Sequence, residues 1–232
     1  LLIGVGKVKK VIFNFVAFDG AEVPPVPPFF RRAREKGTVE DMMLCENMLM
    51  AGLKGAAERL PFYPTRTGLG TDLLQAYPEI QTFSAPYTGE KLVAMPSLPT
   101  NVALIHVNLA DPSGHGVILG NPDFDPLFVK GAKKVFLSAE KVVPLSELKR
   151  HLGFVEILRI WVDGVVETPF GAHPGSCYPD YSVDEAHLRE YLAATREAES
   201  FQAYVEKYIS QEPARYLEQV GITRLLQLAR GG

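Results

Sequence analysis

The sequence predicts an α/β fold, because strand-like segments alternate with helix-like segments along most of its length. Segment 11–18, VIFNFVAF, is rich in β-branched and aromatic residues, which is typical of a buried strand. Segment 92–108, centred on the run VALIHVNLAD, is largely apolar on both faces, as expected for a strand in a parallel sheet. Segment 133–143, KKVFLSAEKVV, supplies another strand.

The segments between these strands carry signals for loops and helices. The prolines of 23–28, VPPVPP, remove backbone donors and restrict their neighbours, so this stretch is expected to form a stiff loop. A short helix is expected over 29–36, followed by a strand over 38–44. The run ENMLMAGLKGAAERL, 46–60, predicts a helix that ends before a proline, and 64–74 forms a glycine loop.

The last third of the chain predicts a hairpin and then helices. Asp163-Gly164 lies between two strand-like runs of 158–170, which indicates a two-residue hairpin turn. Ser182 and Glu185 have capping-box spacing and open a long helix. The apolar face of this helix is formed by Leu188, Leu192, Phe201, Val205 and Tyr208.

Beyond the long helix, Pro213 interrupts the pattern, and two short helices follow that are separated near Gly221. We therefore expect an α/β domain over 1–181 and a helical segment over 182–232 that packs on it.

Composition excludes several classes of function. The chain has 232 residues, 47% of them hydrophobic, and a net charge of -3, which leaves no electrostatic footprint for nucleic acid. No apolar run is long enough to span a membrane, and the first residues do not resemble a signal peptide. Cys45 and Cys177 are too few for a disulfide framework and lack partners at metal-ligand spacing. We expect a cytoplasmic protein without a metal site.

Glu46 is the one charged residue between Met42 and Leu53. Burying an unpaired carboxylate is costly, so such residues are usually paired, exposed or functional. One interpretation places Glu46 in the first turn of a helix, where the helix dipole favours a negative charge. The other makes it a nucleophile or base in a substrate cleft.

Other candidate residues carry weaker signals. Gly68 and Gly70 allow backbone to approach a ligand closely, but their spacing matches neither a P-loop nor a dinucleotide fingerprint. Polar residues that follow the strand over 92–108 lie where α/β sheets bind ligands, although each is equally an ordinary turn residue: Asp111, Ser113, His115 and Asn121. His106 is expected to be a satisfied core histidine. His173 lies on an irregular loop, near Cys177, where side chains reach pockets.

Four sequence blocks, in this order, together resemble family I CoA-transferases, and in particular the A-type subunit of glutaconate CoA-transferase. They are PFYPTRTGLGTDLL, VALIHVNLADPSGHGVILGN, KKVFLSAEKVV and ETPFGAHPGSCYPDYSVDEAHLREYLAA. The resemblance covers essentially the whole chain, and GAHPGSCYPDY is its most specific part. It implies a NagB/RpiA/CoA-transferase-like fold, with an open, mostly parallel sheet and helices on both sides. It also implies a partner B subunit, in an α2β2 complex, and an N-terminal glycine-rich box that is missing from this sequence.

The resemblance also assigns chemistry to Glu46. In the family, a catalytic glutamate sits in an S-E-N-G box, usually on the B subunit, and Cys45-Glu46-Asn47-Met48 resembles that box. Cysteine replaces its serine and methionine replaces its glycine. The resemblance implies a catalytic Glu46 and substrate contacts from Asn47, Arg66, Gly68, Gly70 and His173, with Tyr63 as a further candidate.

The expected function is therefore transfer of CoA between an acyl-CoA and a carboxylic acid, with no bound cofactor and with coenzyme A entering as the substrate thioester. Two alternatives stay within the family. In one, the chain belongs to a hydrolase that opens the ring of a CoA-bound cyclic dione with Glu46 as base. In the other, it is a non-catalytic subunit whose partner carries the nucleophile. A sugar-phosphate binding module with the same sheet architecture is a weaker possibility.

Overall fold

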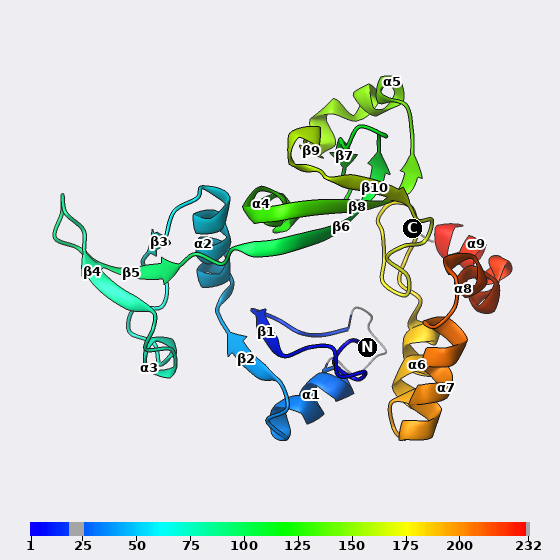
Figure 1. Ribbon diagram of the computed structural model, residues 1–232, viewed down its shortest axis with the longest axis horizontal. Helices are drawn as coiled ribbons and strands as arrows, with labels where there is room; N and C mark the ends of the chain where they lie inside the picture. The colour runs from blue at the N-terminus through cyan, green and yellow to red at the C-terminus, as the bar shows by residue number, and fades with distance from the viewer. Residues whose placement is uncertain (19–25, 231–232) are drawn as a thin grey trace. The chain divides into compact units, whose positions relative to one another are not determined.

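The computed structural model describes residues 1–18 and 26–230 (Figure 1). Contacts between Cα atoms divide the chain into two compact units. The central unit consists of Ile12–Asn14 and Met42–Glu167, and the terminal unit consists of Leu1–Val11, Phe15–Asp41 and Thr168–Gly232. These units are defined by contacts alone and do not test where one folding domain ends and the next begins. The domain boundary expected between 181 and 182 therefore stays a prediction.

The central unit is built on a five-stranded sheet whose long strands are parallel. β6 (Thr100–Ala110) and β8 (Ala132–Val142) pair in parallel, with His106 opposite Ser138. β10 (Gly164–Glu167) extends the sheet in parallel on the other side of β8. Two short strands, β7 (Gly116–Val117) and β9 (Val155–Ile157), add antiparallel pairings to give the order β10-β8-β6-β7-β9. The expected α/β fold with an open, mostly parallel sheet is confirmed.

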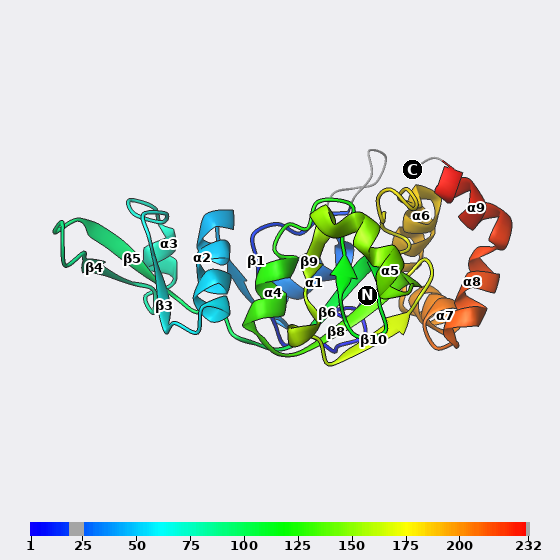
Figure 2. The ribbon, with the colours of Figure 1, turned by 90° about the horizontal axis from the view of Figure 1, so that it is seen from above.

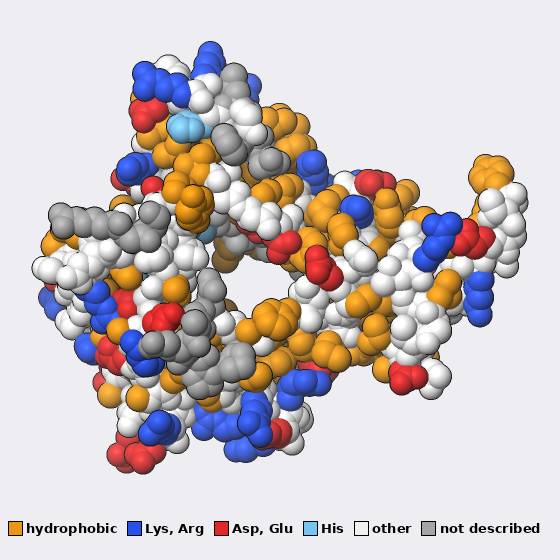
Figure 3. Space-filling model, turned by 180° about the vertical axis from the view of Figure 1, so that it is seen from behind, with side chains coloured by type: hydrophobic (Ala, Val, Ile, Leu, Met, Phe, Trp, Pro, Cys, Tyr) orange, Lys and Arg blue, Asp and Glu red, His pale blue; other side chains and the backbone are white. Residues whose placement is uncertain are grey.

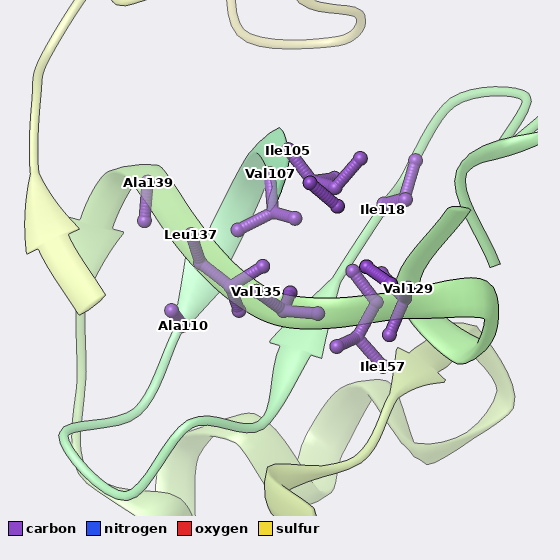
Figure 4. Packing of buried hydrophobic residues seen from close by; sticks show 11 residues of the cluster. Ile105, Val107, Ala110, Ile118, Val129, Val135, Leu137, Ala139 and Ile157 are labelled. Carbon is purple, nitrogen blue, oxygen red and sulfur yellow. The ribbon is translucent and has the colours of Figure 1, made fainter. Parts of the chain in front are cut away.

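One face of this sheet carries the core of the central unit. Alternate residues of β6 and β8 point to the same face and pack with Val129 of α4 (Asp125–Gly131) and Ile157 of β9 (Figure 4). The buried members from the two strands include Ile105, Val107, Val135, Leu137 and Ala139. Burying a Val or Leu side chain contributes about 1.5–3 kcal/mol, so this face fixes the register of the sheet.

A second, smaller sheet in the central unit is antiparallel. It has the order β3-β5-β4, formed by β3 (Phe62–Thr65), β5 (Lys91–Pro96) and β4 (Gln81–Ser84). The helix α2 (Glu46–Ala57) contacts β3 and β5 on one side and α4 on the other (Figures 1 and 2). Small residues permit this close packing, because a Cβ added to Gly131 of α4 would lie 3.2 Å from the Cβ of Ala56.

The continuous strand expected over 92–108 was wrong. The chain leaves β5 at Pro96 and enters β6 only at Thr100, in a different sheet. Proline lacks the N–H group that a ladder requires, and both Pro96 and Pro99 lie at this break. Instead, Leu98 donates its N–H to the carbonyl of Gly52 in α2 at 2.9 Å.

The hairpin expected at Asp163-Gly164 is also absent from the described residues. A 3-10 helix, η2 (Arg159–Trp161), precedes the turn, and β10 runs parallel to β8. Asp163 donates its N–H to the carbonyl of Val135, and its Oδ2 accepts the N–H of Val135, both at 2.8 Å. This pair of hydrogen bonds holds the start of β10 beside β8 and replaces the hairpin partner.

The remaining short elements lie in both units, and α1 belongs to the terminal unit. β1 (Lys10–Phe13) and β2 (Glu40–Met43) pair in a two-stranded sheet, and both are shorter than the expected strands. Residues 23–25 of the Pro-rich stretch 23–28 lie outside the described residues, and α1 begins at the last proline of the stretch, Pro28. The remaining helices are α1 (Pro28–Glu35), α3 (Leu73–Ala76), α5 (Leu145–Leu148) and η1 (Lys149–Phe154).

The C-terminal helices of the terminal unit form an aromatic core. They are α6 (Glu185–Ala194), α7 (Ala198–Tyr208), α8 (Pro213–Val220) and α9 (Ile222–Arg230). Tyr191, Phe201, Tyr204 and Tyr208 are buried where α6 and α7 pack together. The expected separation of α8 and α9 is confirmed, since Gly221 adopts φ +95°, a conformation that favours glycine.

Two expectations for this region were wrong. The long helix is interrupted after Ala194, where the guanidinium of Arg32 binds the carbonyl of Thr195 at 2.6 Å and satisfies the exposed end of α6. The capping box is replaced by Asp184, whose Oδ1 accepts the N–H of His187 at 2.9 Å. Ser182 instead approaches the carbonyl of Leu228 at 3.4 Å.

Within the described part of the chain, none of the helices combines the length and apolar character that crossing a bilayer requires.

Candidate active site

Glu46 occupies the first position of α2, at the junction with the strand before it. Cys45 is the N-cap and has extended backbone angles, φ −72° and ψ 156°, without a side-chain cap. Leu44 donates its N–H to the carbonyl of Phe13 at 2.9 Å, which holds the approach to the helix. The position of Glu46 in the first turn agrees with the interpretation in which the helix dipole stabilises its negative charge. Its side chain is also exposed, so the carboxylate is accessible to a substrate.

The first turn of α2 offers backbone donors next to this carboxylate. Met48 and Leu49 both donate to the carbonyl of Cys45, at 3.0 Å each. The N–H groups of Glu46 and Asn47 have no acceptor among the described residues, as is usual in a first turn. Such donors, together with the positive end of the helix, can bind an anion or stabilise an oxyanion.

The glycine loop packs against the same turn of α2. Met48 is completely buried, and a Cβ added to Gly68 would lie 2.9 Å from its Sδ. Gly68 has φ +99° and Gly70 has φ +73°, and Thr71 closes the turn by donating its hydroxyl to the carbonyl of Gly68 at 2.8 Å. The structure thus brings together two features that the sequence singled out separately.

Tyr77 fixes the other side of the junction. Its hydroxyl accepts the N–H of Met43 at 2.8 Å, which ties the end of α3 to the strand before Glu46. Tyr77 packs against the buried cluster that includes Met42, Leu44 and Met48. The backbone around Glu46 is therefore held by contacts on both sides of the helix start.

Arg66 is paired with a carboxylate of the protein. Its Nε and Nη2 reach Oε1 and Oε2 of Glu90 at 2.5 and 2.8 Å, in the two-bond geometry that guanidinium groups make with carboxylates. The hydrogen bond from Arg66 lowers the pKa of Glu90. Both side chains are solvent-exposed, and Figure 3 shows charges of both signs along the projecting segment formed by β4 and β5. The contact between Arg66 and substrate stays a prediction.

His173 lies in the terminal unit, whereas the other predicted site residues lie in the central unit. Its side chain is buried, with Nε2 3.0 Å from Oδ2 of Asp184 and Nδ1 2.5 Å from the hydroxyl of Tyr216. Burial lowers the pKa of His173, although Asp184 opposes this effect. Its role as a substrate contact stays a prediction.

The loop after β6 forms a tight turn around Asp111. One oxygen, Oδ1, accepts the N–H groups of Ser113, Gly114 and His115 at 2.8, 2.9 and 3.1 Å, and also the Ser113 hydroxyl at 2.7 Å. Oδ2 lies 2.8 Å from Nδ1 of His115. Burial raises the pKa of Asp111, but the hydrogen bonds from Ser113 and His115 outweigh it and lower the pKa to about 2. Asn121 likewise forms a local turn, by accepting the N–H of Asp123 at 3.1 Å.

His106 has a partner at each ring nitrogen, as expected of a satisfied histidine. Nδ1 lies 2.9 Å from the Ser138 hydroxyl and Nε2 lies 2.7 Å from Oε1 of Glu140. His106 of β6 lies opposite Ser138 of β8, and Glu140 follows two positions later on the same face of β8, which is the face opposite the core.

Sequence reasoning missed Glu90, Tyr77 and Asp184. Glu90 lies 24 residues and Tyr77 34 residues from their partners, and no local pattern indicates such pairings. Asp184 did carry a signal, because aspartate is a preferred N-cap residue and directly precedes the helix.

The chain matches the family model described as Coenzyme A transferase over residues 1–167. It is 40% identical over 225 residues to the "Cholesterol ring-cleaving hydrolase IpdA subunit" of Mycobacterium tuberculosis, covering 93% of this chain and 76% of the relative. It is 31% identical to the A-type subunit of glutaconate CoA-transferase from Acidaminococcus fermentans, covering 98% of this chain and 76% of the relative. The crystal structure of glutaconate coenzyme A-transferase from the same organism superposes with a TM-score of 0.88 at 29% identity, covering 98% of this chain and 77% of that chain.

The match covers the whole central unit, including α2, the glycine loop and the parallel sheet. The relatives with these similarities are themselves named as subunits, one of a hydrolase and one of a transferase. Together with the fold, these findings place the chain in the coenzyme A transferase family, whose members act on acyl-CoA substrates, as a family I subunit of the A type.

Proposed function

We propose that this chain is the A-type subunit of a hydrolase that opens the ring of a CoA-bound cyclic dione, with Glu46 as the general base. The observation that carries the proposal is the degree of similarity. Identity is 40% over 93% of the chain to a subunit of a ring-cleaving hydrolase, and 31% to a subunit of a transferase. This order reverses the expectation drawn from sequence motifs, in which CoA transfer came first.

The position of Glu46 suits a base. The carboxylate is exposed at the start of α2, where it can take a proton from water. The resulting hydroxide adds to a ring carbonyl, and the oxyanion formed is stabilised by N–H groups of the first turn, such as that of Asn47. Collapse of the oxyanion breaks the adjacent C–C bond and leaves a carboxylic acid and a carbanion stabilised as an enolate. The proton held by Glu46 then returns to that carbon.

The glycine loop and Arg66 are proposed to bind the substrate. Gly68 and Gly70 lack side chains that would keep a thioester or ring away from α2. Arg66 already binds the Glu90 carboxylate through two bonds, and a carboxylate or carbonyl of the substrate can take the place of Glu90.

We also propose that a B subunit of related fold completes the site, in an α2β2 complex. The support is that the hydrolase relative and the transferase relative are both named as subunits. The coenzyme A moiety enters only as part of the substrate.

A second candidate function is CoA transfer, supported by the transferase among the relatives. In that reaction the Glu46 carboxylate attacks the thioester carbonyl, forms an acyl-glutamyl anhydride and releases the CoA thiolate. The thiolate then attacks the glutamyl carbonyl to give a glutamyl-CoA thioester and the free acid. A non-catalytic role, with the nucleophile on the partner, is the third candidate.

The test of the proposed base uses the complex of both subunits. The variant Glu46→Gln should lower turnover of the acyl-CoA substrate by about 10²–10⁴-fold, because it removes the base while keeping the size of the side chain. Glu58→Gln, at the other end of α2, is the matched control and should leave turnover unchanged. Assembly of both variants is checked by size-exclusion chromatography. Turnover by an assembled Glu46→Gln complex at the wild-type rate would remove Glu46 from the mechanism.

A further inference from the structure

A buried group of potential metal ligands lies in the terminal unit. His173 comes from the loop before α6, Asp184 caps that helix, and His187 lies in its first turn. Each offers one ligand atom, and these atoms all lie within 4.8 Å of one another. The side chains of His173 and Asp184 are 0% and 3% exposed, and His187 is completely buried.

His187 has an unexplained nitrogen. Its Nε2 lies 2.8 Å from the hydroxyl of Tyr204, but its Nδ1 is buried without a hydrogen-bond partner among the described residues. Buried polar atoms nearly always have a partner, and an exception calls for a bound water or ion. The unpaired Nδ1 therefore points to a missing ligand.

Outer hydrogen bonds engage one atom of each of the three side chains. Tyr216 contacts Nδ1 of His173, so the second ring nitrogen, Nε2, faces Oδ2 of Asp184 at 3.0 Å, a contact that a bound ion would replace. Tyr204 contacts Nε2 of His187, which leaves Nδ1. The Oδ1 atom of Asp184 accepts from the backbone of His187 and from Arg224, which leaves Oδ2. Metal-binding histidines and carboxylates are usually oriented in this way by partners in an outer layer.

We propose that Nε2 of His173, Oδ2 of Asp184 and Nδ1 of His187 bind a divalent transition-metal ion, with zinc as the best match. Two imidazoles and one carboxylate form a donor set typical of zinc, with a water in the fourth position. In a tetrahedral zinc site the ligand atoms lie roughly 3.3 Å apart, so the three side chains draw closer on binding. The ion would connect the loop before α6 to that helix.

One positively charged side chain faces the proposed site. Arg224 is the opposing charge, at 2.5 Å from Asp184, but its side chain is 31% exposed and can turn towards solvent.

The test measures metal binding by the full chain. The protein is stripped with EDTA, exchanged into metal-free buffer and titrated with Zn²⁺ by calorimetry and with Co²⁺ by visible absorption. The proposal predicts one equivalent bound and cobalt bands of tetrahedral type. His187→Gln should abolish binding, whereas His151→Gln, a histidine of the central unit, should bind as the wild type does.

A measurement on the wild-type protein keeps the test independent of variant folding. Nitrogen NMR of the histidine rings should show Zn²⁺-dependent shifts at Nε2 of His173 and Nδ1 of His187. Failure to bind one equivalent, unchanged binding by a folded His187→Gln variant, or unchanged ring-nitrogen shifts would each overturn the proposal. Because no acyl-CoA is used, these outcomes are separate from those that test Glu46.

Discussion

Met48 of α2 and Gly68 of the glycine loop are in contact so close that a Cβ on Gly68 would lie 2.9 Å from the Met48 Sδ. Methionine occupies the position of the glycine in the S-E-N-G box that the sequence resembles, and its side chain packs against the loop. The contact joins the helix that carries Glu46 to the loop proposed to bind substrate. A substitution at either Met48 or Gly68 is therefore expected to affect both the helix and the loop.

The variant Gly68→Ala should be destabilised by about 2–3 kcal/mol. A backbone at φ +99° is strained for any residue with a Cβ, and the new methyl group meets the Met48 thioether. Gly70→Ala is the matched control, because Gly70 has φ +73° but no atom within 4 Å of an added Cβ. It should lose only about 1–2 kcal/mol from backbone strain. Urea denaturation measures both, and equal losses would contradict the predicted clash.

Restoring the glycine of the family box should be costly here. Met48 is completely buried in the cluster that includes Leu44 and Met95, so Met48→Gly leaves a cavity and should destabilise the protein by about 3–5 kcal/mol. Met48→Leu, which keeps the volume, should cost less than about 1.5 kcal/mol. Thermal denaturation of both variants checks the difference, and a stable Met48→Gly variant would show that the loop collapses onto α2.

Stability should fall with pH between about 6.5 and 4 because of His187. Its pKa is lowered to about 4 in the fold, by burial and by His173, so the unfolded chain binds a proton more readily over this range. The contribution of neutral His187 to the free energy of unfolding is thus fully present above pH 6.5 and is lost as pH falls towards 4. This contribution is on the order of 3 kcal/mol. The measurement is the unfolding free energy against pH in EDTA. His187→Gln should reduce the slope, and the part due to His173, whose pKa is also lowered by burial, should remain.

Asp184 acts in a separate, lower pH window. Burial raises its pKa, but hydrogen bonds from Arg224 and His173 prevail and lower it to about 2. The stabilisation from its charge is present above pH 3.8 and is lost as pH falls towards 2. A decline between pH 6.5 and 4 that is as steep in His187→Gln as in the wild type would therefore contradict the assignment to His187.

The turn after β6 should depend on the charge of Asp111. Its carboxylate is buried and accepts hydrogen bonds from the backbone and side chains of Ser113 and His115. Asp111→Asn replaces one acceptor oxygen with a donor and should cost about 2–3 kcal/mol. Asp72→Asn, at a helix start where the aspartate makes no side-chain cap, should change stability by less than about 0.5 kcal/mol. Chemical denaturation of both variants measures the difference, and equal stabilities would contradict a structural role for this carboxylate.

Local chemistry allowed much of the fold to be predicted. Pro213 begins a helix and Gly221 ends it, because each residue restricts or frees the backbone by itself. Strands that overlap β6 and β8 were also recognised, the first because both of its faces are largely apolar in the sequence. Glu46 was placed at a strand-to-helix junction, where the structure has it.

The predictions that were wrong concern places where two local signals compete or where a distant residue supplies the contact. Ser182 and Asp184 both suit an N-cap, and the choice of Asp184 follows from contacts with His187 and Arg224. Asp163-Gly164 suits a hairpin, but the bonds from Asp163 to Val135 favour a parallel strand instead. Where the helix is interrupted at Thr195, the carbonyl of Thr195 accepts a hydrogen bond from Arg32. Arg32 is 163 residues away, so no local sequence pattern indicates this contact.

The most direct test of Glu46 as a base for hydrolysis is a turnover experiment with the two-subunit complex in H₂¹⁸O, with borohydride present in a parallel sample. Hydrolysis with Glu46 as base predicts one ¹⁸O atom in the new carboxylate of the product and an unmodified Glu46 peptide by mass spectrometry. A borohydride-reduced Glu46, with no ¹⁸O in the ring-derived product, would contradict this account and establish a covalent transferase.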